Sequence, residues 1–247
     1  MKVSFGTIGP LRISRKLARP HNRCYRFTEQ VTVWNQNFPF ISVPGDMHGA
    51  QRIRDMGLIH PTRALTEYHS YWIYTDSGEK MKNPAFDEAC GRILDLKDPA
   101  SKKHRLAVQE MTKLVSRALN TLPYSLIPVP LHIAVVPSST RGRWSEGLCS
   151  ITAAICAEQP KRLIPVPQAL LRTQTIDKLA RGGNRSIEVH LGSIAPAPRY
   201  EGYFEKKAVL LLDDVTTTGN SLRACGMLLQ QHGADLIYPL ALGRTTL

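Results

Sequence analysis

The pattern of apolar and polar positions divides the chain near residue 125. Before that point Pro and Gly interrupt short apolar runs such as Tyr71–Tyr74, and a helical spacing covers Ser101–Leu119. After residue 130, short apolar runs without alternation are separated by helical segments, which is typical of parallel strands buried on both faces. We therefore predict an α+β N-terminal extension over residues 1–125 and an α/β domain over residues 126–247.

The α/β domain is expected to contain a five-stranded, mostly parallel sheet flanked by helices. The candidate strands are Leu131–Val136, Arg162–Val166, Ile187–Leu191, Ala208–Leu212 and Leu236–Leu242. Small and apolar residues predict helices over Gly147–Ala157 and Gly219–His232, the second of which Gly233 would end.

The most informative segment is Val209–Ser221, where an apolar run is followed by Asp213, Asp214 and a loop rich in hydroxyl side chains. Such a loop, leading into a helix, can surround a phosphate with backbone N–H groups and hydroxyls. The alternative is a polar turn that only caps the helix, for which one acid and one Thr would suffice. The candidate phosphate-binding residues are Thr216, Thr217, Thr218, Gly219, Asn220 and Ser221.

The two acids, Asp213 and Asp214, suit a different part of the same ligand. Carboxylates repel a phosphate but accept hydrogen bonds from sugar hydroxyls, and they favour a Mg²⁺ ion held partly by those hydroxyls or by water. Phosphate, sugar diol and magnesium together describe a phosphorylated ribose.

The segment closely resembles the phosphoribosyl-pyrophosphate (PRPP) signature of type I phosphoribosyltransferases, and the flanking residues resemble the ComF-like members of that superfamily. The flanking matches are Val136-Pro137 with Arg141-Gly142, Arg172-Thr173-Gln174 with Leu179-Ala180-Arg181 and Asn184, and Leu242-Gly243-Arg244-Thr245. The resemblance covers about residues 126–247. Cys24 and Cys90 are too sparse for the zinc module with which ComF-like proteins often begin, and residues 181–208 look irregular for that group.

The resemblance implies roles for two further loops. Ser138, Ser139 and Arg141 would contact pyrophosphate, while residues 172–185, including Arg172, Lys178 and Arg181, would form a flexible loop that closes over the site. The alternative is that these basic residues are solvent-exposed charges in loops and bind no ligand.

The net charge of +12 suggests that a negatively charged molecule is a candidate partner. Residues 1–28 contain seven Lys and Arg and no acid, and residues 1–130 contain 19 basic and 11 acidic residues. This surplus favours a polyanion such as nucleic acid or a nucleoprotein complex, although it could simply keep the protein soluble. No apolar run approaches the length of a membrane span, and five Cys without a C-x-x-C pair favour a cytoplasmic protein without a disulfide framework.

Two functions remain open. The first is an enzyme that transfers phosphoribose from PRPP·Mg²⁺ to an acceptor that the sequence does not identify. The second is a PRPP-sensing or nucleotide-sensing module, in a regulator or a retron-type antiphage system, that associates with nucleic acid. A homo-oligomer is compatible with both.

Two residue clusters before residue 125 complete the candidates. Aromatic residues near Tyr71–Tyr74 could stack bases beside Arg52, Arg54 and Arg63, but the strand-like pattern there favours a core role. The His residues between His21 and His69 have no strong metal-ligand spacing.

Overall fold

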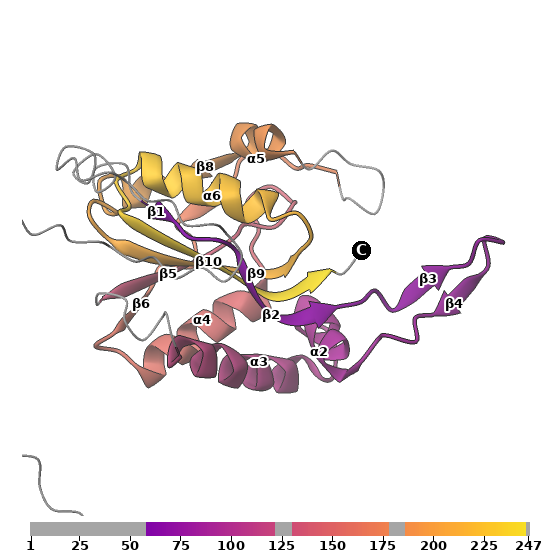
Figure 1. The fold of residues 1–247 in the computed structure, drawn as a ribbon. Coiled ribbons are helices and arrows are strands. Elements are labelled where there is room, and N and C mark those ends of the chain that lie inside the picture. Colours follow the sequence, from indigo (N-terminus) through magenta and orange to yellow (C-terminus); the bar gives the residue numbers. More distant parts are fainter. Residues whose placement is uncertain (1–57, 122–129, 178–185, 246–247) are drawn as a thin grey trace, which may run out of the picture. The chain divides into compact units, whose positions relative to one another are not determined.

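A parallel sheet forms the centre of the computed structural model, which describes residues 58–121, 130–177 and 186–245 (Figure 1). The strand order is β1-β10-β9-β5-β6, and β2 also pairs with β10. The strands are β1 (Leu58–Ile59), β2 (Arg63–Tyr68), β5 (Leu131–Val135), β6 (Leu163–Pro165), β9 (Ala208–Thr216) and β10 (Leu236–Thr245). All pairs in this sheet are parallel, so the predicted α/β fold with a mostly parallel sheet is confirmed.

Strands β1 and β2 follow one another along the same edge of β10. Leu58 is opposite Leu236 at the start of β10, and Arg63 is opposite Leu240 farther along. The sheet is therefore five strands wide, with β1 and β2 sharing one edge position.

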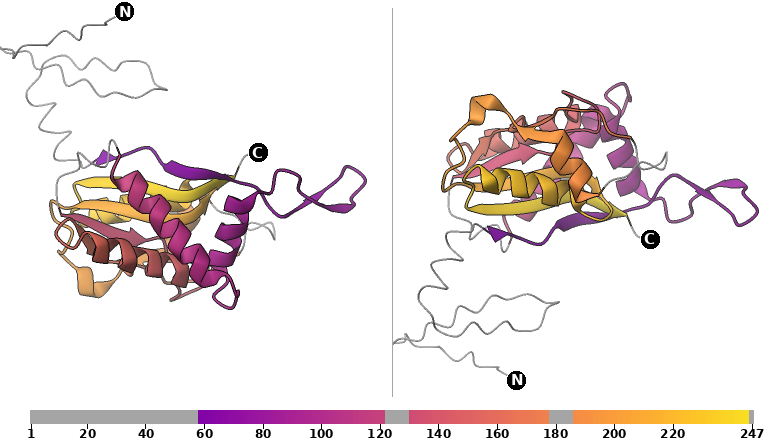
Figure 2. Two further views of the ribbon diagram at one scale, coloured as in Figure 1. Left: turned by 90° about the horizontal axis from the view of Figure 1, so that it is seen from below. Right: turned by 90° about the horizontal axis from the view of Figure 1, so that it is seen from above.

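Helices cover both faces of the sheet (Figures 1 and 2). One face carries α2 (Glu88–Lys97), α3 (His104–Leu119) and α4 (Glu146–Glu158), and the other carries α5 (Ile187–Ser193) and α6 (Asn220–Gln231). Side chains of β9 alternate between two cores. Leu210 and Leu212 join the first, and Val209 and Leu211 join the second. Burial on both faces explains the unbroken apolar run in the sequence.

Two smaller antiparallel pairs accompany the main sheet. The strands β3 (Trp72–Tyr74) and β4 (Lys80–Lys82) form a hairpin that extends away from the sheet and helices (Figures 1 and 2). The strands β7 (Leu170–Arg172) and β8 (Ile194–Pro196) pair near α5, and a 3₁₀ turn, η3 (Pro198–Tyr200), follows them. None of the helices in the described ranges is long and apolar enough to cross a membrane.

The predicted strand over Ile187–Leu191 is wrong, because these residues form the helix α5. Ser186 caps the helix by accepting a hydrogen bond from the Val189 N–H. A segment this short, with three apolar residues, is compatible with either a strand or a short helix that has one packed side. The fifth position of the sheet comes instead from β1 and β2.

The structure also departs from the predicted boundary near residue 125. Strands β1 and β2 belong to the central sheet, and α2 and α3 pack on the same core as α4. Helices α2 and α4 approach closely at Gly147, where a Cβ atom would lie only 2.5 Å from Leu96 Cδ1. Residues 58–121 are thus part of the α/β body, while residues 1–57 lie outside the described residues.

Candidate functional site

The two adjacent acids lie near the end of β9, at the carboxyl edge of the sheet. Both are half-buried. Asp213 accepts a hydrogen bond from Ser221 Oγ at 3.1 Å and another from the Asp214 N–H at 2.9 Å. Asp214 lies 3.3 Å from Lys97 Nζ, at the end of α2. The carboxylates therefore border the site while α6 and α2 hold them in place.

Asp213 has an unusual protonation equilibrium. Desolvation, followed by the negative charge of Asp214, raises the pKa of Asp213 to about 7, against the opposing effects of the Asp214 N–H, the Ser221 hydroxyl and Lys97. A bound cation or a hydrogen-bond donor would favour the ionised form. Raised carboxyl pKa values of this origin are frequent at functional sites, so the electrostatics support a ligand with donors or a metal ion here.

The loop after β9 turns into α6 through Gly219. This residue has φ of +81°, in the left-handed region that glycine adopts without steric cost. Gly219 has no side chain with which to cap α6, so the helix begins without a side-chain cap. The first-turn N–H groups of a helix form a ready site for an anion, and a phosphate could provide the missing cap.

The hydroxyl residues of this loop have different environments. Thr217 Oγ1 accepts a hydrogen bond from Thr245 Oγ1 at 2.9 Å, and Thr218 Oγ1 is 3.4 Å from the Asn220 N–H. Thr216 is only 2% exposed, and its Oγ1 has no hydrogen-bond partner within the described part of the chain. The structure thus gathers Thr217 to Ser221 around the start of α6 and leaves Thr216 in the strand beneath them.

The loop after β5 reaches the same edge of the sheet, because β5 and β9 are parallel neighbours with Val135 opposite Leu212. Its residue Ser138 donates its N–H to the Arg143 carbonyl at 3.0 Å. The Ser139 carbonyl accepts from the Ile176 N–H at 3.0 Å, and the Arg141 N–H donates to Thr175 Oγ1 at 3.0 Å. The backbone of this loop is held by these hydrogen bonds, while the Arg141 side chain is exposed.

Arg172 does not lie in a flexible loop. It is the last residue of β7 and is 2% exposed. Its Nε donates to the Ser138 carbonyl at 3.0 Å, its Nη1 donates to Ser193 Oγ at 2.6 Å, and its Nη2 is 3.4 Å from His190 Nδ1. Arg172 therefore holds the loop after β5 in place through its hydrogen bond to the Ser138 carbonyl. The other two predicted loop residues, Lys178 and Arg181, lie outside the described residues.

Two basic residues at this edge have roles that the sequence pattern did not indicate. Lys97 lies 3.3 Å from Asp214 and 5.5 Å from the Tyr68 ring centroid, and Arg244 donates from Nη2 to the Thr62 carbonyl at 2.8 Å. The sequence marked Arg244 only as part of a strand ending. Nothing near Lys97 in the sequence signals its role, because its partner is more than a hundred positions away.

Asp213 and Asp214 could bind a magnesium ion whose other ligands are phosphate oxygens and water. Within residues 58–121, 130–177 and 186–245, no three His, Cys, Asp or Glu side chains converge as a metal cage. Mg²⁺ commonly binds through one or two carboxylates together with phosphate oxygens and water. Asp213 and Asp214 could supply that limited protein contribution.

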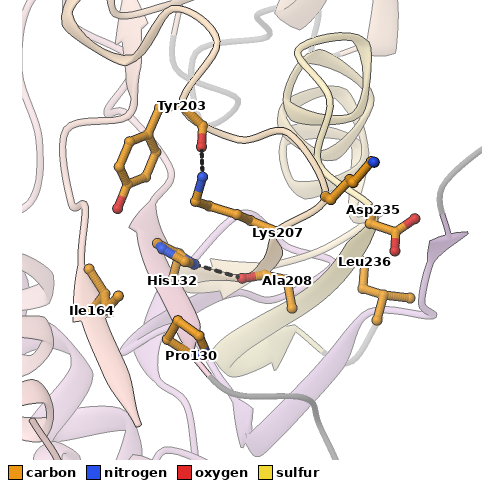
Figure 3. Close-up of a pocket in the computed structure, with 9 residues that line it drawn as sticks. Pro130, His132, Ile164, Tyr203, Lys207, Ala208, Asp235 and Leu236 are labelled. Carbon is orange, nitrogen blue, oxygen red and sulfur yellow. Dashed lines mark hydrogen bonds between the residues drawn. The ribbon is translucent and has the colours of Figure 1, made fainter. Parts of the chain in front are cut away.

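A cavity of about 350 Å³ lies at the opposite edge of the sheet (Figure 3). It is lined by residues at or near the amino ends of β5, β9 and β10. Two of its polar groups already have partners, since His132 Nδ1 is 3.4 Å from the Ala208 carbonyl and Lys207 Nζ donates to the Tyr203 carbonyl. Because it lies at the amino ends of the strands, this cavity is separate from the acids and the hydroxyl loop.

Comparisons with known proteins give a likeness of fold only. No protein-family model matches the chain, and no curated protein matches it. A solved hypoxanthine phosphoribosyltransferase from Staphylococcus aureus is similar in structure, with a TM-score of 0.35 and 13% sequence identity over 62% of this chain and 80% of that chain. A likeness at this level carries no argument about what this chain binds or catalyses.

Proposed function

We propose that the chain binds PRPP with Mg²⁺ at the carboxyl edge of its sheet and transfers phosphoribose to an acceptor, with release of pyrophosphate. One observation carries the proposal. Two half-buried acids are followed within a few residues by a left-handed Gly219 and a helix without a side-chain cap. A sugar diol and a phosphate are the ligand groups that these two neighbouring features complement.

Each part of the site has a role in this proposal. The 5′-phosphate lies at the start of α6, where Thr217, Thr218, Gly219, Asn220 and Ser221 surround it and the buried Thr216 lies beneath them. Asp213 and Asp214 would accept hydrogen bonds from the ribose hydroxyls and would be the residues that hold a magnesium ion. Ser138, Ser139 and Arg141 bind the pyrophosphate, and Arg172 positions their loop through the Ser138 carbonyl.

The reaction requires no covalent intermediate with the protein. The bond between the anomeric carbon and the pyrophosphate oxygen breaks, its electron pair leaves with pyrophosphate, and the acceptor's lone pair forms the new bond. Positive charge develops on the ribose ring and negative charge on the leaving group. The Asp213 and Asp214 carboxylates stabilise the former, and Arg141 stabilises the latter. Magnesium, when bound, neutralises further charge on the leaving oxygens.

Finer assignments follow from the sequence motifs. The ComF-like pattern around Arg141, Arg172 and Arg244 favours that branch of the superfamily, and Lys178 and Arg181 are proposed to approach pyrophosphate from residues 172–185. The acceptor would be selected by residues before about 126. Of these, α2 already contributes Lys97 to the site.

The experiment measures pyrophosphate release and PRPP binding separately. The full chain is mixed with PRPP, Mg²⁺ and a panel of purine and pyrimidine bases, and PRPP binding is followed by calorimetry. Binding with pyrophosphate release supports the transferase. Binding without release from any base leaves the second candidate, a PRPP-sensing module. A folded protein that does not bind PRPP overturns both.

A further inference from the structure

The hairpin β3–β4 carries two aromatic and two lysine side chains on one face. Trp72 is opposite Lys82 and Tyr74 is opposite Lys80 in the antiparallel register. Because side chains alternate along a strand, these four residues share a face, and Ile73 and Met81 belong to the other. Lys80 Nζ lies 4.4 Å from the Trp72 ring centroid, as expected for diagonal neighbours on one face.

The aromatic side chains of this face are exposed. Tyr74 is 71% exposed and Trp72 is 47% exposed, so the core role favoured by the sequence is wrong for this hairpin. The hairpin extends away from the body, and no helix of the described ranges covers it (Figures 1 and 2). Neighbouring exposed aromatic rings rimmed by polar side chains are typical of interaction surfaces.

The chemistry of this face is that of a base-stacking surface. An aromatic ring binds the flat face of any unpaired base, and a nearby lysine binds the phosphate between bases. Trp72 and Tyr74 are alternate residues of one strand, so their Cα atoms are separated by roughly 6.6–6.8 Å. That separation allows one base to stack on each ring. Lys80 can move from the Trp72 ring to a phosphate because its stem is flexible.

The charge of the face favours a polyanion over a second copy of this chain. Strands β3 and β4 contain two lysines and no acid; the acids of the hairpin, Asp76 and Glu79, lie in the connection between them. A two-fold pairing of this face with itself would bring the lysines of both copies together. The net charge of +12 acts in the same direction.

We propose that the Trp72–Tyr74 and Lys80–Lys82 face of the hairpin binds single-stranded nucleic acid by stacking two bases and neutralising adjacent phosphates. Duplexes bind less well, because their bases are already stacked on one another. This function goes beyond the proposed PRPP chemistry and does not depend on it.

The test uses the full chain and a fluorescently labelled oligothymidylate at low salt, with fluorescence anisotropy as the readout. We expect Trp72→Ala with Tyr74→Ala to weaken binding about tenfold or more, because affinity falls severalfold for each base that loses its aromatic stacking partner. Lys80→Gln with Lys82→Gln should reduce the slope of log affinity against log salt by roughly 0.7 for each phosphate that is no longer neutralised. Met81→Ala, on the opposite face, is the matched control and should change neither.

The outcomes separate the hairpin from other surfaces. Loss of binding in the aromatic variant, with a normal Met81→Ala protein, supports the proposal. Equal affinity of all variants would assign any binding to another part of the chain and overturn it. Absence of binding by the unaltered chain would also overturn it. A third outcome would also overturn the proposal: the unaltered chain is a dimer, the aromatic variant is a monomer, and both bind the oligonucleotide equally well. The aromatic face would then be a dimer interface.

Discussion

The two edges of the central sheet differ: a cavity lies at one, and the proposed binding site lies at the other. The amino edge has a cavity of about 350 Å³, but its His132 and Lys207 side chains are already engaged with backbone carbonyls. The carboxyl edge has the raised pKa of Asp213, the helix start at Gly219 and the Thr216 hydroxyl, which has no partner among the described residues. We place the proposed binding site at the second edge because of these polar groups.

The direction of the chain explains this difference. In a parallel sheet connected by helices, each helix that follows a strand begins at the carboxyl edge, where its N-terminal N–H groups and positive dipole end face a ligand. The helix α6 begins there directly after β9. Loops at the amino edge enter the strands instead, and their backbone groups bond one another, as the Asp235 N–H does with the Lys207 carbonyl. If this account is correct, substitutions at the two edges should have very different effects.

The largest difference is expected for the acids. Asp213→Asn combined with Asp214→Asn should abolish measurable PRPP binding in calorimetry while the protein stays folded, because the amides lack the negative charge with which the carboxylates are proposed to hold the ribose hydroxyls and magnesium. Lys207→Met is the matched control at the amino edge and should leave PRPP affinity unchanged. A folded double variant with unaltered affinity would disprove the sugar-diol assignment and remove the distinction between the edges.

The next largest effect is expected at Gly219. Valine strongly disfavours the Gly219 φ of +81°, so Gly219→Val should distort the phosphate loop. PRPP affinity should fall by about tenfold or more, since several N–H hydrogen bonds to a dianion would break together. Gly192→Val serves as the control because a Cβ there meets no atom within 4 Å. Phosphate bound elsewhere, with residues 216–221 turned away from it, would contradict the loop assignment.

A smaller effect is expected when the carboxyl-edge loop loses its support. Arg172→Met leaves the Ser138 carbonyl and Ser193 hydroxyl without their guanidinium donor. A buried group left without its partner costs about 1–3 kcal/mol, which for a chain of this size corresponds to a fall in Tm of at least roughly 2–4 °C. Arg199→Met, which removes an exposed hydrogen bond to Gln168, should change Tm little by calorimetry. Equal melting temperatures would show that Arg172 does not support the loop.

The last expected effect concerns stability and pH. The folded state raises the pKa of Asp213 to about 7 from its ordinary value of 3.8. The folded protein therefore binds this proton more tightly than the unfolded chain, so the group makes stability fall as pH rises from about 4 to 7. Asp213→Asn removes this penalty. It should raise Tm at pH 8, where the carboxyl group is ionised, by at least roughly 2–4 °C, which is the change expected for each kcal/mol removed, and have little effect at pH 4.

The control for this prediction is Asp235→Asn, an exposed carboxylate at the amino edge. Melting curves of both variants without ligand, between pH 4 and pH 8, are sufficient. A Tm difference for Asp213→Asn that is the same at every pH would show that burial of the charge is not its cause.

Local patterns in the sequence were enough to predict much of the site. The apolar run of β9, the two acids and the Gly that begins α6 are neighbours along the chain, so they are also neighbours in space. Strands β5, β6 and β10 and helices α4 and α6 were likewise predicted near their observed bounds. A strand buried on both faces produces a continuous apolar run, and a helix buried along one side produces a helical spacing of apolar residues.

Other features depended on residues that are far apart along the chain. The sequence alone determined the acids and the hydroxyl loop that identify the candidate ligand, since each requires only a strand, a turn and a helix in succession. The tertiary structure decided that β1 and β2 complete the sheet, with Thr66 bonded to Leu242 across 176 positions. It also decided that Arg172 is buried, that Lys97 meets Asp214 and that Trp72 and Tyr74 are exposed. Pairing and burial of this kind depend on which segments meet in the folded chain. The local spacing of apolar residues does not identify a partner that is far away in the sequence.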